Sequence, residues 1–288
     1  MQLSKLMRNI GPHVPVALIM LNSRRVEIAR RERFKRLKGK VVEAVNSIAA
    51  LTEAQCVDAR FLETSLIPFL GLNDEHLDEQ PPELSTSFGK GLHIWQYPSQ
   101  LADYLVWLSR NAGEVKSYLE IGCRWGGMFI LITEWIRRVG RLQATTAIDP
   151  IKPSPLIETY FELIRNQSGA NRPPIQATYV RDFSTSQAAR EIANKVSPDL
   201  VFIDGDHRLR GALADHMLVR EKARIVVHHD VCSDACPDTT FLWETLKKLE
   251  AHEFEFFDFV SQYPSVKGNF LGIGAMKRKM YATTPEFR

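Results

Sequence analysis

A regular alternation of strand-like and helix-like segments from residue 117 onward is the strongest constraint on the fold of this chain. Five short apolar runs occur there, at 117–121, 144–148, 175–180, 199–203 and 224–228. Each is followed by a helical pattern, and these patterns cover 127–139, 155–167, 185–196, 211–221 and 239–250. Two further strands, 254–260 and 269–276, have no helix between them. The alternation predicts an α/β fold, with a parallel sheet between layers of helices.

A glycine-rich turn joins the first of these strands to its helix. The strand ends at Glu120–Ile121, and Gly122, Gly126 and Gly127 come before the helical pattern. Glycine permits backbone angles that other residues avoid, and it lets a ligand approach the main chain closely. Free N–H groups at the start of the helix favour anionic ligand atoms such as a carboxylate. A tight turn that binds nothing is the alternative interpretation.

Polar residues follow the second and third strands, at the edge of a parallel sheet where ligands bind. Asp149 follows the second strand, and an acidic residue there can accept hydrogen bonds from both ribose hydroxyls of a nucleoside. After the third strand, the Asp182 carboxylate could accept from an adenine amino group, and Phe183 could cover the ring. Asp182 could equally cap a helix or shape a turn.

Carboxylates and imidazoles gather after the fourth and fifth strands. Segment 203–207 reads Ile-Asp-Gly-Asp-His, and segment 228–230 reads His-His-Asp. Uncompensated carboxylates packed this closely repel one another and raise one another's pKa, so a cation is their natural partner. Carboxylate and imidazole together are hard-to-borderline ligands for a divalent ion. A structural zinc site built from the nearby histidines with Cys232 and Cys236 is a weaker alternative, because the cysteine spacing is loose.

The spacing Glu120-x-Gly122-x-x-x-Gly126-Gly127 resembles motif I of class I S-adenosylmethionine-dependent methyltransferases. The resemblance implies a Rossmann-like seven-stranded sheet whose last strand is antiparallel. It also implies that Glu120, Gly122 and Gly126 bind S-adenosylmethionine, with the loop around Gly122 at its amino-acid end. By the same resemblance Asp149 binds the ribose, and Asp182 and Phe183 lie at the adenine.

The pattern Ile-Asp-Gly-Asp-His at 203–207, followed by His-Asp at 229–230, is similar to the cephalosporin hydroxylase and macrocin O-methyltransferase family. More distantly it resembles catechol O-methyltransferases. The resemblance implies that Asp204, His229 and Asp230 bind a divalent metal, which holds two substrate oxygens, and that His207 is the catalytic base. The family usually has an acidic residue at position 229. A neutral imidazole binds magnesium poorly and favours manganese, iron, cobalt or zinc. Either the metal differs, or His229 points away and the site is weaker, or no metal binds. Magnesium or manganese is the expected ion, with others possible.

Residues 1–90 are predicted to form a mostly helical N-terminal extension, and residues 91–288 the methyltransferase domain. An apolar stripe over 22–51 predicts one long amphipathic helix, which must bury its stripe on the core or on a second subunit of a homo-oligomer. Residues 71–90 are polar and acidic, and we interpret them as a loop or linker. Ser99 is the expected N-cap of the next helix.

Charge is uneven along the chain. Residues 1–50 carry 11 Lys/Arg against 3 Asp/Glu, whereas the net charge of the whole chain is only +3. The basic run 24–40 predicts either a solvated helix face or a contact with nucleic acid, a membrane surface or an acidic partner. Phe34 is the one aromatic residue among these basic residues, so stacking on single-stranded nucleic acid is poorly supported.

Composition and cysteine usage indicate a cytoplasmic protein with a full core. The 288 residues are 44% hydrophobic, and no apolar run approaches the ~18–20 residues that cross a bilayer. The nearest is the short run at 14–21. Four cysteines in a chain of this length do not make a disulfide framework.

Together these features predict an S-adenosylmethionine-dependent O-methyltransferase that acts on a small hydroxylated molecule with a divalent metal. His207, whose ordinary pKa is about 6.5, would take the hydroxyl proton. The first alternative is a nucleic-acid methyltransferase that docks through the basic helix; the absence of a Pro-Pro-Tyr type tetrapeptide after the fourth strand counts against it. The second is a non-catalytic cofactor-binding protein. Hydroxylase activity is suggested by the family name alone.

Overall fold

The centre of the molecule is a seven-stranded sheet in the order β3-β2-β1-β4-β5-β7-β6. Strands β1 to β5 run parallel, and β7 pairs antiparallel with both β5 and β6. The predicted α/β sheet with an antiparallel last strand is therefore confirmed. The computed structural model describes residues 28–166 and 173–279. The strands are Ser117–Ile121 (β1), Ala144–Ile148 (β2), Gln176–Val180 (β3), Leu200–Ile203 (β4), Ile225–His229 (β5), Phe254–Phe259 (β6) and Ile273–Arg278 (β7).

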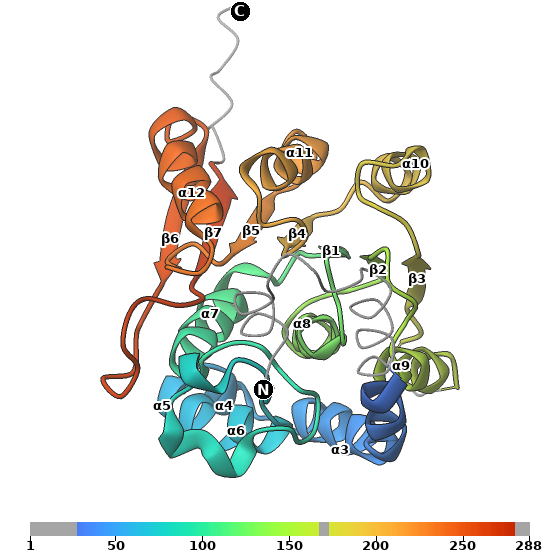
Figure 1. Cartoon of the computed structure of the whole chain (residues 1–288). Coiled ribbons are helices and arrows are strands. Elements are labelled where there is room, and N and C mark those ends of the chain that lie inside the picture. The colour runs from blue at the N-terminus through green and yellow to red at the C-terminus, as the bar shows by residue number, and fades with distance from the viewer. Residues whose placement is uncertain (1–27, 167–172, 280–288) are drawn as a thin grey trace, which may run out of the picture.

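Helices cover both faces of this sheet. Figure 1 shows α10, α11 and α12 on one side, and α7, α8 and α9 on the other. The helices are Pro98–Asn111 (α7), Gly127–Val139 (α8), Pro155–Asn166 (α9), Gln187–Val196 (α10), Leu209–Val219 (α11) and Pro237–Leu249 (α12). The alternation after residue 117 thus predicted α8 to α12 and the seven strands correctly, with boundaries that differ by a few residues. The strand expected at 269–276 begins later, because Leu271 and Gly272 have positive φ angles of 63° and 95° that interrupt an extended chain.

The single helix expected over 22–51 is wrong within the described residues. A helix covers 28–36, a turn at Leu37 interrupts it, and α3 (Lys38–Ala49) follows. Leu37 closes a tight turn by donating its N–H to the Phe34 carbonyl at 3.0 Å. Residues 22–27 of the expected helix, the apolar run 14–21 and the start of the basic run lie outside the described residues.

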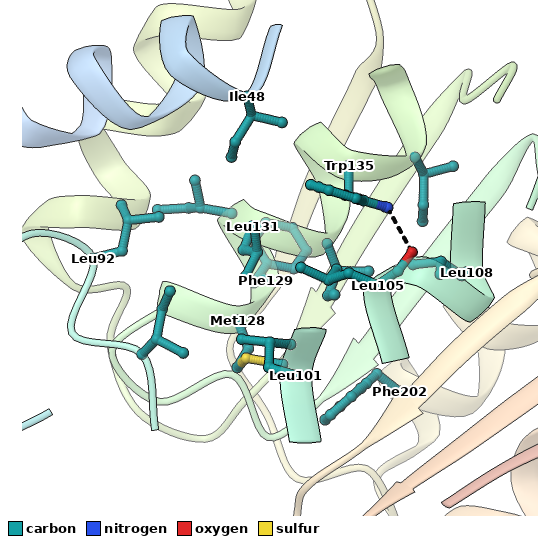
Figure 2. Packing of buried hydrophobic residues seen from close by; sticks show 14 of the residues in the cluster. Ile48, Leu92, Leu101, Leu105, Leu108, Met128, Phe129, Leu131, Trp135 and Phe202 are labelled. Carbon is teal, nitrogen blue, oxygen red and sulfur yellow. Dashed lines mark hydrogen bonds between the residues drawn. The ribbon is translucent and has the colours of Figure 1, made fainter. Parts of the chain in front are cut away.

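The apolar stripe itself is correct, and it is buried within this chain. Phe34, Val41, Val45 and Ile48 are all at most 1% exposed, and they belong to the same core cluster as residues of α8. Figure 2 shows Ile48 near Leu131 and Trp135, while the Trp135 indole N–H donates to the Leu105 carbonyl of α7 at 3.1 Å. This cluster includes residues on both sides of the proposed domain boundary at residue 90, and the division stays a prediction.

A chain of short helical turns links α3 to α7. The expected loop at 71–90 is largely irregular, but it is folded onto the domain, with Asn73, Glu75 and Gln80 buried. Helix α7 is preceded by Tyr97 and begins at Pro98, not after an N-cap at Ser99, because proline suits the first helical position. Among the described residues, no helix is long and apolar enough to cross a membrane. The short elements are Glu53–Cys56 (α4), Ala59–Phe61 (α5), the π-helical turn Leu62–Leu66, Ile67–Leu70 (α6), and the 3-10 turns Leu77–Glu79 and Pro82–Ser87.

Candidate functional site

A cavity of about 1170 Å³ opens at the carboxyl ends of the central strands. Its walls come from the glycine-rich loop after β1, the loops after β2 to β5, and the segment that precedes α7. This is the edge where the strand order reverses between β1 and β4, which is the usual ligand position in such sheets. Every predicted site residue except Asp182 lines this cavity: Glu120, Gly122, Gly126, Asp149, Phe183, Asp204, His207, His229 and Asp230.

The two predicted cofactor glycines are required by the packing of their own loop. Gly122 has a φ of +84°, and a Cβ there would lie 2.0 Å from the Asp204 carbonyl oxygen. Gly126 has a φ of +87°, and a Cβ there would lie 2.2 Å from the Ile157 side chain. The positive φ angles and the lack of room for a Cβ both exclude residues larger than glycine at these positions. Gly122 therefore lets the loop after β1 lie against the loop after β4, and Gly126 lets it lie against α9.

Asp149 is buried at the end of β2 and holds the glycine-rich loop through hydrogen bonds. Its Oδ2 accepts the Arg124 backbone N–H at 2.7 Å, and its Oδ1 accepts the Ile151 N–H at 2.7 Å. Burial raises the pKa of this carboxyl, and the two backbone donors oppose that shift. Each oxygen still has a lone pair that can accept another hydrogen bond. The arrangement leaves Asp149 able to receive hydroxyl donors from the cavity.

The two residues predicted to lie at an adenine differ in position. Phe183 lines the cavity and is 66% exposed, so its ring is open to a ligand. Asp182 does not line the cavity, and its Oδ1 accepts the Phe183 N–H at 2.8 Å. In this structure Asp182 therefore shapes the turn after β3.

Glu120 ends in the floor of the cavity, where its environment favours the protonated carboxyl. Burial raises its pKa to about 8, although the hydrogen bond donated by the Tyr118 hydroxyl opposes the shift. The nearby Asp204 and Asp149 carboxylates raise it further. Without a positive ligand, Glu120 is largely neutral at pH 7.

Asp204, His207, His229 and Asp230 form a cluster whose candidate ligand atoms all lie within 4.8 Å of one another. The His207 Nε2 lies 2.9 Å from Asp230 Oδ2 and 3.1 Å from Asp204 Oδ1. Asp230 has a φ of +56°, a left-handed conformation that is uncommon for a residue other than glycine. The prediction that the ends of β4 and β5 bring carboxylates and imidazoles together is confirmed by this geometry.

The protonation of His207 differs from the sequence-based expectation. Hydrogen bonds to Asp204 and Asp230, together with their negative charges, raise the pKa of His207 to about 10. The ordinary value of about 6.5 is therefore wrong for this state of the protein. In this structure the imidazolium of His207 lies between the Asp204 and Asp230 carboxylates and balances part of their negative charge.

His229 presents a buried ring nitrogen to the same carboxylates. Its Nδ1 lies 3.2 Å from Asp204 Oδ1 and 3.5 Å from Asp230 Oδ2, yet neither approach has hydrogen-bond geometry. The opposite ring nitrogen, Nε2, lies 2.5 Å from the Gln96 Oε1. Burial lowers the pKa of His229, but the charges of Asp204 and Asp230 raise it well above its ordinary value. A positive charge at Nδ1 is therefore favoured, and a cation bound there would take the place of the proton.

The alternative zinc site has no geometric support. Among the described residues, the cluster at Asp204 is the one group of three or more potential metal ligands, and it contains no cysteine. His228 faces away from it, with Nε2 3.1 Å from the His216 Nδ1.

A second charged cluster beside the cavity was not predicted from the sequence. The buried Glu75 carboxylate contacts the guanidinium groups of Arg124 at 2.7 Å and Arg30 at 3.2 Å. It also accepts the Trp125 indole N–H at 3.0 Å. The Arg124 guanidinium in turn lies 4.7 Å from the centre of the Trp95 ring, which lines the cavity. The polar composition of 71–90 indicated a loop and gave no signal that Glu75 is buried.

Arginines of the basic run form contacts within this chain. Arg31 donates to the Pro153 carbonyl at 2.9 Å, and Arg33 pairs with Asp74 at 2.6 Å. Together with Arg30, these residues attach the first described helix to the domain. Arg36 at the end of this helix and Lys38 at the start of α3 are exposed.

Comparison with known proteins gives no match to a family model and none to a curated protein. Solved structures with a similar fold include a candidate rRNA methylase from Clostridium thermocellum, with 10% identity, a TM-score of 0.43, and coverage of 63% of this chain and 98% of that one. A candidate methyltransferase from Streptococcus mutans, in complex with SAH, has 12% identity and a TM-score of 0.42 over 64% of this chain and 99% of that one.

Another similar structure is the MycE methyltransferase of the mycinamycin biosynthetic pathway, in complex with Mg and SAH. It has 12% identity and a TM-score of 0.41, with coverage of 67% of this chain and 52% of that one. This chain therefore matches about half of that protein.

Proposed function

We propose that this protein is an S-adenosylmethionine-dependent O-methyltransferase that acts on a small hydroxylated molecule with the help of a divalent cation. One observation carries the proposal. The glycine-rich loop and Asp149 line the same cavity as the cluster of Asp204, His207, His229 and Asp230. The residues proposed to bind a nucleoside and those proposed to bind a cation therefore line the same cavity.

The cofactor would lie along the ends of β1 and β2. Asp149 would accept the ribose hydroxyls, the loop at Gly122 and Gly126 would receive the amino-acid end, and Phe183 would cover the adenine. Glu120 would lie near the cofactor's ammonium group, whose positive charge would favour the ionised carboxylate. Asp182 would support Phe183 from the turn. The cavity of about 1170 Å³ exceeds the ~300–1,000 Å³ of a typical ligand pocket, which supports room for a cofactor and an acceptor together.

The side chains at the ends of β4 and β5 would prepare the acceptor. Asp204, His229 and Asp230 would hold the cation, which lowers the pKa of a bound hydroxyl when present. The acceptor oxygen would attack the sulfonium methyl in line, the C–S bond would break with its electron pair moving to sulfur, and His207 would take the hydroxyl proton. A cation held by Asp204 and Asp230 would offset the charges that raise the pKa of His207, so that its neutral ring could accept the proton.

Calorimetry with matched variants tests the proposal. Metal-stripped protein is titrated with S-adenosylmethionine and separately with magnesium, manganese and zinc. We expect Asp149→Asn to weaken cofactor binding about 10-fold or more while cation binding persists, because one buried hydrogen-bonded acceptor is lost. We expect Asp204→Asn to do the opposite. Absence of cofactor binding under every condition would refute the methyltransferase proposal.

The outcomes also separate the alternatives. Cofactor binding without any cation or acceptor would favour the non-catalytic protein, and full kcat in His207→Ala with the true substrate would remove the base assignment. Salt-dependent RNA or DNA binding would favour the nucleic-acid alternative. The double variant Arg36→Glu with Lys38→Glu tests this alternative best, because both residues are exposed and their charge reversal should weaken nucleic-acid binding. A deletion of residues 1–50 would instead remove core residues of α3.

A further inference from the structure

A buried chain of hydrogen bonds connects the backbone next to β7 with His229. The Gly272 N–H donates to the Gln100 Oε1 at 3.1 Å, and the Gln96 side-chain NH₂ donates to that same oxygen. The Gln96 Oε1 then faces the His229 Nε2 at 2.5 Å. Gln96 and Gln100 are at most 2% exposed, so water does not compete for these groups. None of the features predicted from the sequence includes these two glutamines.

The direction of every hydrogen bond in this chain follows from its first donor. A backbone N–H can only donate, so Gly272 requires that Gln100 present its oxygen. That oxygen requires the NH₂ of Gln96 on its other side, and Gln96 must therefore turn its own oxygen toward His229. The Gln100 NH₂ faces the Phe270 carbonyl at 3.5 Å, which agrees with this assignment. If the oxygen and nitrogen of either side-chain amide exchanged places, two acceptors or two donors would face each other.

The last hydrogen bond of this series, between Gln96 and His229, determines which ring nitrogen of His229 carries the hydrogen. An amide oxygen accepts only, so Nε2 must be the N–H of the imidazole. In the neutral ring the Nδ1 then keeps its lone pair. That nitrogen is buried, lacks a hydrogen-bond partner, and lies 3.2 Å and 3.5 Å from the carboxylate oxygens of Asp204 and Asp230. Without a cation, a proton on Nδ1 would lie between the ring and the two carboxylates, and a bound cation would take the place of that proton.

We propose that Gln96 and Gln100 are positioning residues that commit His229 to bind a cation through Nδ1. By this means the centre takes an ion with affinity for imidazole nitrogen, zinc most strongly and manganese less so, in preference to magnesium. The inference rests on the proposed metal-assisted function and specifies its cation. A ligating histidine commonly donates its other N–H to an oxygen, which fixes the ring and raises its basicity. Imidazole nitrogen favours borderline ions, whereas magnesium prefers oxygen ligands.

The test replaces the acceptor that faces His229. Gln96→Met keeps the length of the side chain and removes the oxygen, so the His229 tautomer is no longer fixed. The matched control is Gln262→Met: Gln262 donates to the Phe270 carbonyl at 3.1 Å, does not line the cavity and has no recorded bond to His229. Manganese, zinc and magnesium affinities are measured by calorimetry on the full chain, together with S-adenosylmethionine affinity.

We expect Gln96→Met to weaken manganese and zinc binding 10- to 100-fold, the usual effect of losing such a partner. Magnesium affinity and cofactor affinity should change less than about 3-fold, because magnesium relies on the carboxylates. Gln262→Met should leave all four affinities unchanged. Gln96→Glu should restore part of the manganese affinity, since a carboxylate also accepts from Nε2–H.

A direct readout of the tautomer completes the experiment. In protein labelled with ¹⁵N-histidine, NMR should show a protonated Nε2 for His229, and zinc should shift the Nδ1 resonance alone. Equal losses for manganese and magnesium, or a neutral His229 that carries its hydrogen on Nδ1 instead of Nε2, would overturn the inference while the metal-assisted function survives. Wild-type protein that binds S-adenosylmethionine but no divalent ion would instead overturn both the inference and the metal assistance.

Discussion

Two charged clusters lie beside the same cavity, and they differ in how completely their polar groups are satisfied. The Glu75 carboxylate has two guanidinium groups and an indole N–H as partners, which together supply more positive charge than it needs. The Asp204 cluster has two carboxylates, an imidazolium between them, a ring nitrogen without a hydrogen bond, and Asp230 in a left-handed conformation. Saturated clusters stabilise a fold, whereas unsatisfied and strained ones indicate a place for a ligand.

The pKa of Glu75 shows how strongly its partners act. Burial alone would raise the pKa of this carboxyl, but the nearby His93 ring, whose Nε2 lies 3.8 Å from Oε1, and the charges of Arg124 and Arg30 lower it to about 2. The ionised carboxylate is therefore the stable form at every physiological pH. This cluster fastens the segment before α7 to the glycine-rich loop without a ligand.

The largest effect on stability is expected from Glu75→Gln. A pKa lowered from 4.5 to about 2 corresponds to about 3 kcal/mol of unfolding free energy at pH 7. Because the folded pKa lies below the unfolded one, this stabilisation is present above pH 4.5 and is lost as the pH falls to about 2. Urea denaturation at several pH values measures it, and the variant should lose that part of the pH dependence.

The matched control for this prediction is Glu158→Gln. Glu158 is partly exposed and pairs with Arg31 at 3.5 Å and Lys152 at 3.6 Å. Exposed pairs contribute about 0–1 kcal/mol, so we expect at most about 0.5 kcal/mol here. Equal losses in both variants would mean that burial does not distinguish the Glu75 cluster.

The second prediction concerns the unsatisfied cluster, which should gain stability from a cation. At a free manganese concentration 100 times its Kd, the unfolding free energy should rise by about 2.7 kcal/mol, because the ion binds the folded chain alone. Asp204→Asn should abolish this gain, whereas Glu75→Gln should keep it. Thermal or urea unfolding with and without manganese gives the answer. A gain that survives in Asp204→Asn would place the ion elsewhere.

Much of the sheet, and most of the candidate site, could be predicted from the sequence because the signals are local. Apolar runs, the glycines at 122 and 126, and the polar residues after each strand all lie within a few positions of the element that they define. The parallel sheet then brings Asp149, Asp204 and Asp230 to one edge without further information.

The remaining features depend on contacts between distant segments. Glu75 is buried because Arg30 and Arg124, far from it in sequence, converge on it. Gln96 acquires its role from His229 and Gln100, and its own neighbours do not reveal that role. The pKa of His207 depends on two carboxylates from different loops, and the turn at Leu37 interrupts a helical pattern whose spacing continues across it. Single-segment patterns cannot contain such information.

Asp215 tests whether an unsatisfied carboxylate is sufficient to indicate a ligand. This residue of α11 is buried, its Oδ2 lacks a hydrogen bond, and burial raises its pKa to about 6. Because the folded pKa lies above the unfolded value of 3.8, ionisation opposes folding, and stability falls as the pH rises from 3.8 to about 6.

We expect Asp215→Asn to stabilise the protein by up to about 3 kcal/mol at pH 7 and to flatten the profile between pH 4 and 6. Its manganese affinity should equal that of the wild type, since Asp215 lies outside the four-residue cluster. Urea denaturation and calorimetry measure the two quantities. A loss of manganese affinity would extend the cation site to α11.

The smallest effect is expected from Arg124→Lys, which lies between the two regions. The Arg124 side chain is 48% exposed, pairs with Glu75, and lies over the Trp95 ring, whereas its backbone N–H donates to Asp149. Lysine keeps the charge and the backbone donor but loses the planar contact, so we expect a loss of about 0.5–1 kcal/mol in urea. Cofactor affinity should stay within about 2-fold, because the backbone bond to Asp149 is retained. A 10-fold loss of affinity would show that the guanidinium contacts the cofactor, and the Glu75 cluster would then belong to the binding site as well as to the fold.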